Sequence, residues 1–319
     1  MYLKRGIFVL KNKKNNQDKK VCFDMILNSP NIKYIKALDS NKIDNMKFGK
    51  NILEFSKILL TLKNIDFSYF YRNIETLKTQ NVGGLIKEDT RAGYSVKYNF
   101  IIFKDYFNPY EMYHELIHLS TSIFDNINYV EFCGFSQYNY KTNLKIGTGI
   151  NEGYTEYFNE KIFNNKTNTY IIEKSIAKSI EQILGSINME RLFFKANLKE
   201  LIIKLSEYNS LDNTLEFIQL FDYISDNSIK FFNKEKLGKK FYKAIDKIFD
   251  YLILTYITKN KSDLSNDIIS KDEYDNNLEI FINNLGAFNY YKDNIEYPMR
   301  FISEKKVIKK MKKIIKRWK

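Results

Sequence analysis

Histidine is rare in this chain, since 319 residues contain only His114 and His118. Cysteine is as rare, and Cys22 and Cys133 neither supply a disulfide framework nor form a CxxC pair. This excludes a disulfide-stapled domain and a cysteine-rich zinc knuckle, and it favours a reducing compartment. The three prolines and twelve glycines are typical of a largely helical protein with few tight turns.

Long apolar runs are absent as well. No stretch approaches the roughly 20 apolar residues that a membrane-spanning helix requires, and Asp250 interrupts the closest one, at 248–257. The short apolar run at 6–10 leads into a Lys- and Asn-rich stretch rather than into the small residues of a cleavage site. The sequence therefore predicts neither a membrane span nor a secretion signal, and we expect a cytoplasmic protein.

The net charge of +13 is concentrated at the two ends of the chain. Residues 1–20 carry +6 and residues 305–319 carry +9, which leaves the body between them at −2. A nearly neutral body predicts no nucleic-acid platform. At 305–319 an apolar stripe that includes Met311 and Trp318 faces a row of Lys and Arg. This pattern is typical either of weak contact with an anionic surface or of a helix that packs its stripe on the body.

Hydrophobic spacing predicts an α+β, predominantly helical fold, with a small sheet in the N-terminal half and an all-helical C-terminal lobe. The expected strands are 6–10, 21–27, 85–87 and 94–103. The expected helices are 51–62, 69–79, 108–125, 149–163, 169–184, 187–195, 198–207, 211–225, 235–258, 272–285 and 300–318. We divide the chain into an α/β lobe at 1–165, a helical lobe at 166–304 and a basic amphipathic helix at 305–319.

Both histidines lie in one five-residue segment, HELIH at 114–118, which matches the HExxH motif. Asn108 and Pro109 before it form a good helix start, because Asn caps free amides, Pro suits the first helical position and Glu111 can close a capping box. Residues four apart lie on one face of a helix, so both imidazoles can bind one metal ion with Glu115 beside it.

Zinc in a hydrolase takes three protein ligands and one water. With no third histidine, the third ligand is expected to be a carboxylate from the segment GINEGYTEYF at 149–158. On a helix there, Glu152, Glu156 and Asn159 lie opposite the apolar side chains. We predict Glu152 as the ligand and Glu156 as an acid that orients a ligating imidazole through its distal N–H. Glu156 or Glu160 would replace Glu152 if the phase of the helix differed.

HExxH followed by an NExxxE-type helix resembles the gluzincin metallopeptidases, the class that includes thermolysin-like enzymes and aminopeptidase N. The resemblance implies that His114, His118 and Glu152 bind zinc, that Glu115 is the catalytic base and that Glu156 supports the first histidine. It also implies a metalloprotease, a zinc hydrolase that cleaves a peptide or protein substrate.

The resemblance covers residues 97–163, and the chain departs from the family pattern at three points. The 33 residues between His118 and Glu152 exceed the usual gap, which predicts an insertion at 128–148. No GxMEN-type exopeptidase motif precedes the histidines, and no later histidine can donate to an oxyanion. The remaining candidates for that donor are Tyr138, Tyr140 and Tyr297.

Two other functions remain open. One is a non-catalytic, metal-stabilised helical binding protein that contacts nucleic acid or an anionic membrane through its basic termini. Glu115 argues against it, because a structural metal site needs no general base. The other is a zinc amidase or esterase that acts on a non-peptide substrate. The peptidase interpretation further predicts that the strand at 98–103 is an edge to which a peptide could add.

Overall fold

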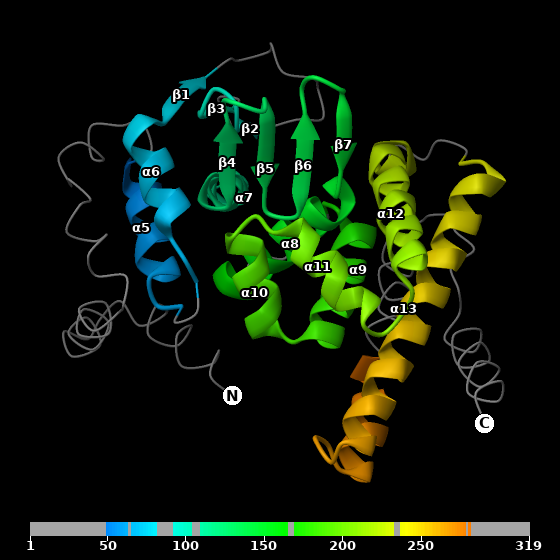
Figure 1. Cartoon of the computed structure of the whole chain (residues 1–319). Coiled ribbons are helices and arrows are strands. Elements are labelled where there is room, and N and C mark those ends of the chain that lie inside the picture. Colours follow the sequence, from blue (N-terminus) through cyan, green and yellow to red (C-terminus); the bar gives the residue numbers. More distant parts are fainter. Residues whose placement is uncertain are drawn as a thin grey trace, which may run out of the picture. The chain divides into compact units, whose positions relative to one another are not determined.

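The computed structural model describes residues 49–62, 65–81, 92–103, 109–164, 169–232, 237–278 and 280–281. The predicted segments at 6–10, 21–27, 85–87 and 300–318 lie outside the described residues, as does the tail at 305–319. Within the described part the fold is α+β and predominantly helical, as predicted, and every element after the last strand is a helix (Figure 1). No helix in these ranges is both long enough and apolar enough to cross a membrane.

The chain divides into two compact units. One contains residues 1–134, 158–166 and 194–196, and the other contains 135–157, 167–193 and 197–319. Helices α8 (Thr148–Phe163) and α10 (Ser186–Phe194) each contribute residues to both units. The expected lobe boundary at residue 165 lies next to the one at 166, while residues 135–157 group with the helical unit.

Aromatic residues fill the core of the first unit. The ring of Phe55 stacks on Phe163 at a centroid distance of 5.5 Å and lies 5.9 Å from Tyr113. Helix α7 packs against α5, α6 and β2. The elements of this unit, apart from the shared helices, are α5 (Gly49–Leu59), α6 (Ser68–Thr76), β1 (Lys78–Asn81), β2 (Ala92–Ser95), β3 (Phe100–Phe103), α7 (Pro109–Ser120), β4 (Ser122–Asp125) and β5 (Val130–Cys133).

The segment 94–103, predicted as one strand, is a hairpin. Strands β2 and β3 pair antiparallel with Tyr94 opposite Ile101, and the turn between them ends at Asn99, whose φ of 47° an Asn tolerates. The Asn99 side chain stabilises this turn by donating to the backbone oxygen of Asn73 at 2.6 Å. Strand β1 pairs parallel on the other side of β3. Because β3 has neighbours on both edges, the prediction that 98–103 is a free edge for a peptide is wrong.

Helix α7 ends at Ser120 rather than near residue 125, and the chain turns at once into β4. Hydroxyls at 120–122 donate to carbonyl oxygens of the last helical turn. The Asn73 amide donates to the carbonyl oxygens of Leu119 at 2.8 Å and of Ser122 at 2.9 Å. These donors satisfy carbonyls that a longer helix would have satisfied itself. Apolar spacing alone fits either a helix or a strand here, and pairing with β5 decides for the strand.

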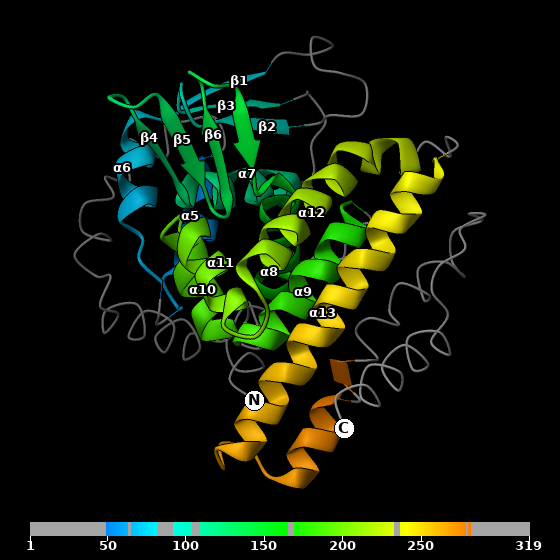
Figure 2. The ribbon, with the colours of Figure 1, turned by 45° about the vertical axis from the view of Figure 1, so that its right-hand side comes forward.

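The second unit is helical except for one hairpin, formed by β6 and β7 within the predicted insertion at 128–148. The long helices α12 and α13 lie side by side (Figures 1 and 2), joined by stacking of Phe217 on Tyr251 at 4.3 Å. Besides the shared helices, the elements are β6 (Ser136–Asn139), β7 (Leu144–Ile146), α9 (Ile171–Leu184), α11 (Leu198–Ser206), α12 (Leu211–Phe232) and α13 (Lys239–Ser265).

Helices α12 and α13 extend about two turns past their predicted ends at 225 and 258. Residues 225–228 of α12 are Ser, Asp, Asn and Ser, whose side chains compete with the helical backbone for hydrogen bonds. Instead, Asn227 and Ser228 donate back to carbonyl oxygens of the preceding turn, at Tyr223 and Ser225. Such local bonds let the helix continue through the polar run.

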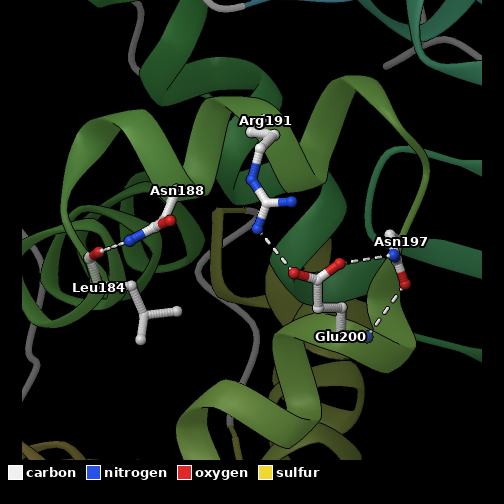
Figure 3. A network of polar contacts seen from close by, with 5 residues as sticks. All are labelled: Leu184, Asn188, Arg191, Asn197 and Glu200. Carbon is white, nitrogen blue, oxygen red and sulfur yellow. Dashed lines mark hydrogen bonds and ion pairs between the residues drawn. The ribbon is translucent and has the colours of Figure 1, made fainter.

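The turn from α10 into α11 is fixed by a polar network (Figure 3). Asn197 caps α11 by accepting from the Glu200 backbone N–H at 3.0 Å, and the Glu200 carboxylate accepts from the Asn197 amide at 3.0 Å. The other carboxylate oxygen of Glu200 pairs with Arg191 at 2.6 Å. This reciprocal cap explains why α11 begins at the predicted residue 198.

Helix α8 begins on a carboxylate. The two carboxylate oxygens of Asp222 accept the backbone N–H groups of Gly147 at 2.8 Å and Gly149 at 2.9 Å. Burial raises the pKa of Asp222, while these two N–H groups lower it. Gly147 has a φ of 80°, and a Cβ there would lie 2.0 Å from the Phe135 carbonyl oxygen. Only glycine fits this position, so the start of α8, and with it the phase of Glu152, is well defined.

Gly153 provides a test of the packing of α8 against α9. A Cβ at this residue would lie 2.3 Å from the backbone oxygen of Glu173, which cannot move aside as a side chain would. We expect Gly153→Ala to lower the free energy of unfolding by about 2 kcal/mol or more, although Gly→Ala in an open helix stabilises by about 1 kcal/mol. Chemical denaturation measures the difference.

Gly238→Ala is the control for this prediction, because a Cβ there would meet nothing within 4 Å. It should change the free energy of unfolding by less than about 1 kcal/mol. A Gly153→Ala protein as stable as the parent would contradict the close approach of α8 and α9.

Candidate metal centre

The two histidines lie on one face of α7 with their ring nitrogens facing one another. His114 Nε2 and His118 Nε2 are 3.0 Å apart, and the rings meet edge to face at a centroid distance of 4.7 Å. Two nitrogens bound to one tetrahedral ion at about 2.0–2.1 Å would be about 3.3 Å apart. The pair is therefore close to the geometry that a shared ion requires.

The C-terminal part of α8 packs against the start of α7. The Asn159 amide donates to the Tyr110 carbonyl oxygen at 3.1 Å, and Phe163 stacks on Tyr113 at 4.4 Å. Two turns before Asn159, on the same face of α8, is Glu152. The histidines follow Tyr110 by one and two turns on α7.

His114, His118 and Glu152 each offer one ligand atom, and these atoms all lie within 4.8 Å of one another. His118 is buried and the other two are half-buried. This group could hold a metal ion, and it is the set of ligands that the sequence predicts. Two imidazoles and one carboxylate suit a first-row divalent ion and leave a coordination position for water or substrate.

Both faces of α8 are buried, although only the apolar face was expected in the core. Glu156 is 2% exposed and Asn159 is 1% exposed. The Glu156 carboxylate accepts from the Thr169 hydroxyl at 3.1 Å, and the Asn151 side chain accepts from the Phe135 N–H at 3.1 Å. The predicted contact of Glu156 with an imidazole stays a prediction. Glu115, the predicted base, is buried on α7 at 7% exposure.

Cys133 was not predicted to be a neighbour of the histidines. Its sulfur lies 3.4 Å from His118 Nδ1 and 3.6 Å from the His118 carbonyl oxygen. It reaches this position because β4 follows α7 immediately and pairs with β5, with Ser122 opposite Cys133. A separation of 15 residues matches no metal-ligand spacing, so only the strand pairing shows the contact.

The predicted oxyanion donors have other surroundings or lie outside the described residues. The Tyr138 hydroxyl donates to the Asn143 side chain at 3.0 Å within the β6–β7 hairpin, and its ring packs edge-on against Tyr140. Tyr297 lies outside the described residues. The identity of this donor stays a prediction.

Glu173 of α9 is a second group that sequence reasoning missed. Its carboxyl is fully buried, and burial raises its pKa to about 7, with the charge of Glu152 raising it further. Ser228 and Ser225 act in the opposite direction, but neither carboxyl oxygen accepts a hydrogen bond of good geometry from the described residues. Below pH 7 this carboxyl is therefore mostly protonated. It lies in the same unit as Glu152.

No protein-family model, curated protein or solved structure matches the chain. The resemblance to the gluzincins is carried by the residues at 114–118 and 151–156.

The metal centre predicts a stoichiometric divalent ion. We expect the chelator-stripped chain to bind about one ion per molecule, and an ion at 100 times its Kd to raise the free energy of unfolding by about 2.7 kcal/mol. Thermal unfolding with a panel of divalent ions measures this as a higher Tm. Glu152→Gln should remove most of the shift because it removes the anionic ligand.

Glu160→Gln, on the same helix, is the matched control and should keep the shift in Tm. If Glu160→Gln lost the shift and Glu152→Gln kept it, the carboxylate ligand would be Glu160 instead.

Glu173 predicts a fall in stability with rising pH. An unfolded Glu titrates near about 4.3, whereas native Glu173 titrates at about 7. Between these values the native chain holds a proton that the unfolded chain has lost. The free energy of unfolding should therefore decrease as pH rises, by about 4 kcal/mol at most. Urea unfolding across this range should show a shallower decline in Glu173→Gln.

Glu216→Gln, a change at an exposed carboxylate of α12, should keep the parent's pH dependence. A Glu173→Gln protein whose stability changes with pH as the parent's does would show that Glu173 titrates normally.

Proposed function

We propose that the chain is a zinc-dependent metallopeptidase of gluzincin type, with His114, His118 and Glu152 as zinc ligands. The observation that carries this proposal is the convergence of the three ligand atoms within 4.8 Å, two of them from α7, the helix that also holds Glu115, and one from α8. Two imidazoles and one carboxylate, with one position left open, form a donor set typical of catalytic zinc.

The ion, when bound, supplies an acidified water and a polarised scissile carbonyl. Glu115 would accept a proton from the attacking water on its carboxylate and would return it to the leaving amine. Its burial excludes bulk solvent, which strengthens the electrostatic interactions of the carboxylate. Asn159 orients α8 on α7 through the Tyr110 carbonyl oxygen, and this contact holds Glu152 in register with the histidines.

Cys133 is buried and forms no disulfide within the described residues. A reduced cysteine beside the proposed centre suits a reducing, cytoplasmic location, which we propose for this activity.

A zinc amidase or esterase is the second candidate, because it would use the same ligands and the same base. Only the substrate separates the two. A non-catalytic binding protein has less support, since a structural metal site needs no general base such as Glu115. The basic termini on which that alternative depends lie outside the described residues.

Glu115→Gln tests the catalytic proposal. Gln keeps the shape of the side chain but cannot accept the proton, so we expect zinc content to stay near one per chain. Hydrolysis of a peptide library should fall by about 10²–10⁴-fold. Elemental analysis gives the metal content, and mass spectrometry of the peptides gives the cleavage rate.

Glu216→Gln serves as the control and should cleave at the parental rate. A parent chain that holds zinc but cleaves simple amides or esters and no peptide would favour the second candidate. Equal rates in the parent and in Glu115→Gln would overturn the role of Glu115.

A further inference from the structure

The sulfur of Cys133 lies against the ring edge of His118 that faces away from His114. Cys133 is 6% exposed, and its Sγ is 3.4 Å from His118 Nδ1, 3.6 Å from the His118 carbonyl oxygen and 3.9 Å from the Thr121 hydroxyl. Nδ1 and Nε2 occupy opposite sides of the imidazole, so the sulfur contacts one nitrogen while the other faces His114 Nε2 at 3.0 Å.

One arrangement of protons fits the contacts of the sulfur. In it the thiol S–H donates to the His118 carbonyl oxygen, which only accepts and which also accepts the Thr121 backbone N–H at 3.2 Å. The direction of the 3.4 Å contact between Sγ and His118 Nδ1 depends on the tautomer of the ring, and a sulfur whose proton points to the carbonyl oxygen accepts from Nδ1–H. With its proton on Nδ1, a neutral His118 presents a lone pair at Nε2.

We infer that Cys133 is a positioning residue, whose sulfur accepts the Nδ1–H bond of His118 and so holds its Nε2 lone pair toward the shared ion position. This inference rests on the proposed metal centre. Ligating histidines usually donate their second N–H to a carboxylate, carbonyl or water, and that bond sets the tautomer and orientation of the ring. Here a neutral thiol has this role for His118, while Glu156 is predicted to act on an imidazole as a carboxylate.

The same assignment determines the metal-free state. If His118 Nε2 carries no proton, the 3.0 Å contact between the two rings must use a proton on His114 Nε2. The metal-free chain should therefore contain one histidine of each neutral tautomer, with Nε2–H at His114 and Nδ1–H at His118.

Nuclear magnetic resonance of the ¹⁵N-labelled histidine rings tests this assignment directly, because the chain has only two histidines and each single His→Gln variant identifies a signal. In the metal-free full chain at a pH where both rings are neutral, we expect the two different tautomers. Cys133→Ala should shift His118 toward the Nε2–H tautomer, and Cys133→Ser, which keeps an acceptor, should retain Nδ1–H. An Nε2–H tautomer at His118 in the parent chain would overturn the inference without any variant.

Zinc affinity gives the second measurement, by competition with a chromogenic chelator. Loss of a partner of a ligating histidine weakens metal binding by about 10–100-fold, and we expect the lower end for a weak sulfur acceptor in Cys133→Ala. Val130→Ala is the matched control, because Val130 lies on β5 and is 6% exposed like Cys133. It should lose stability yet keep both the tautomer and the zinc affinity.

The outcomes separate this inference from the peptidase proposal. If the chain binds zinc and shows the expected tautomers but cleaves no peptide, the peptidase proposal is wrong and the proposed role of Cys133 stands. If Cys133→Ala keeps the tautomer and the zinc affinity of the parent chain, Cys133 does not position His118, whatever substrate the chain hydrolyses. If Cys133→Ala failed to fold, the tautomers observed in the parent chain and in Cys133→Ser would still test the role of Cys133.

Discussion

The structure depends on burying a helix with polar residues on one face and apolar residues on the other. Along α8, most polar side chains taken out of water have a partner, since an unsatisfied buried group costs about 1–3 kcal/mol. The exceptions among the described residues are the Thr155 hydroxyl and the Asn159 amide oxygen. Asn159 finds the Tyr110 carbonyl oxygen, Glu156 the Thr169 hydroxyl and Asn151 the Phe135 N–H. These bonds fix the rotation of α8 about its axis. For Glu152 the proposed partner is the metal ion. In this proposal, the metal centre satisfies the Glu152 carboxylate when α8 is buried.

Local periodicity was enough to predict the parts of the fold made of long helices. The helices after residue 148 were found because apolar residues recur every three to four positions over several turns. The N-terminal half was harder, since Phe and Ile near 94–103 and 120–125 fit a strand, a hairpin or a helix equally well. There Asn99 in a left-handed conformation and the Asn73 side chain bonded to the end of α7 decide the outcome. Neither effect has a periodic pattern in the sequence.

The candidate site divides in the same way. His114, His118 and Glu152 could be predicted because each belongs to a short motif on a single helix, and helical spacing gives its face. Cys133 and Glu173 could not, since each reaches the site through pairing or packing between elements distant in sequence. Cys133 comes from the register of β5 on β4, and Glu173 from the approach of α9 to Gly153. The signal that could have found them is contact between elements, which one sequence does not contain.

One of the two missed residues has an electrostatic effect on the proposed centre. Burial raises the pKa of Glu173 to about 7, so below that pH most of this carboxyl is protonated. A protonated carboxyl does not add the negative charge that an ionised carboxylate in the same place would bring. Fewer negative charges around a ligand set leave more of the ion's positive charge to act on a bound water, which lowers the pKa of that water. In the proposed centre the burial of Glu173 thus favours hydrolysis, whereas purely structural sites are commonly closed by additional thiolates.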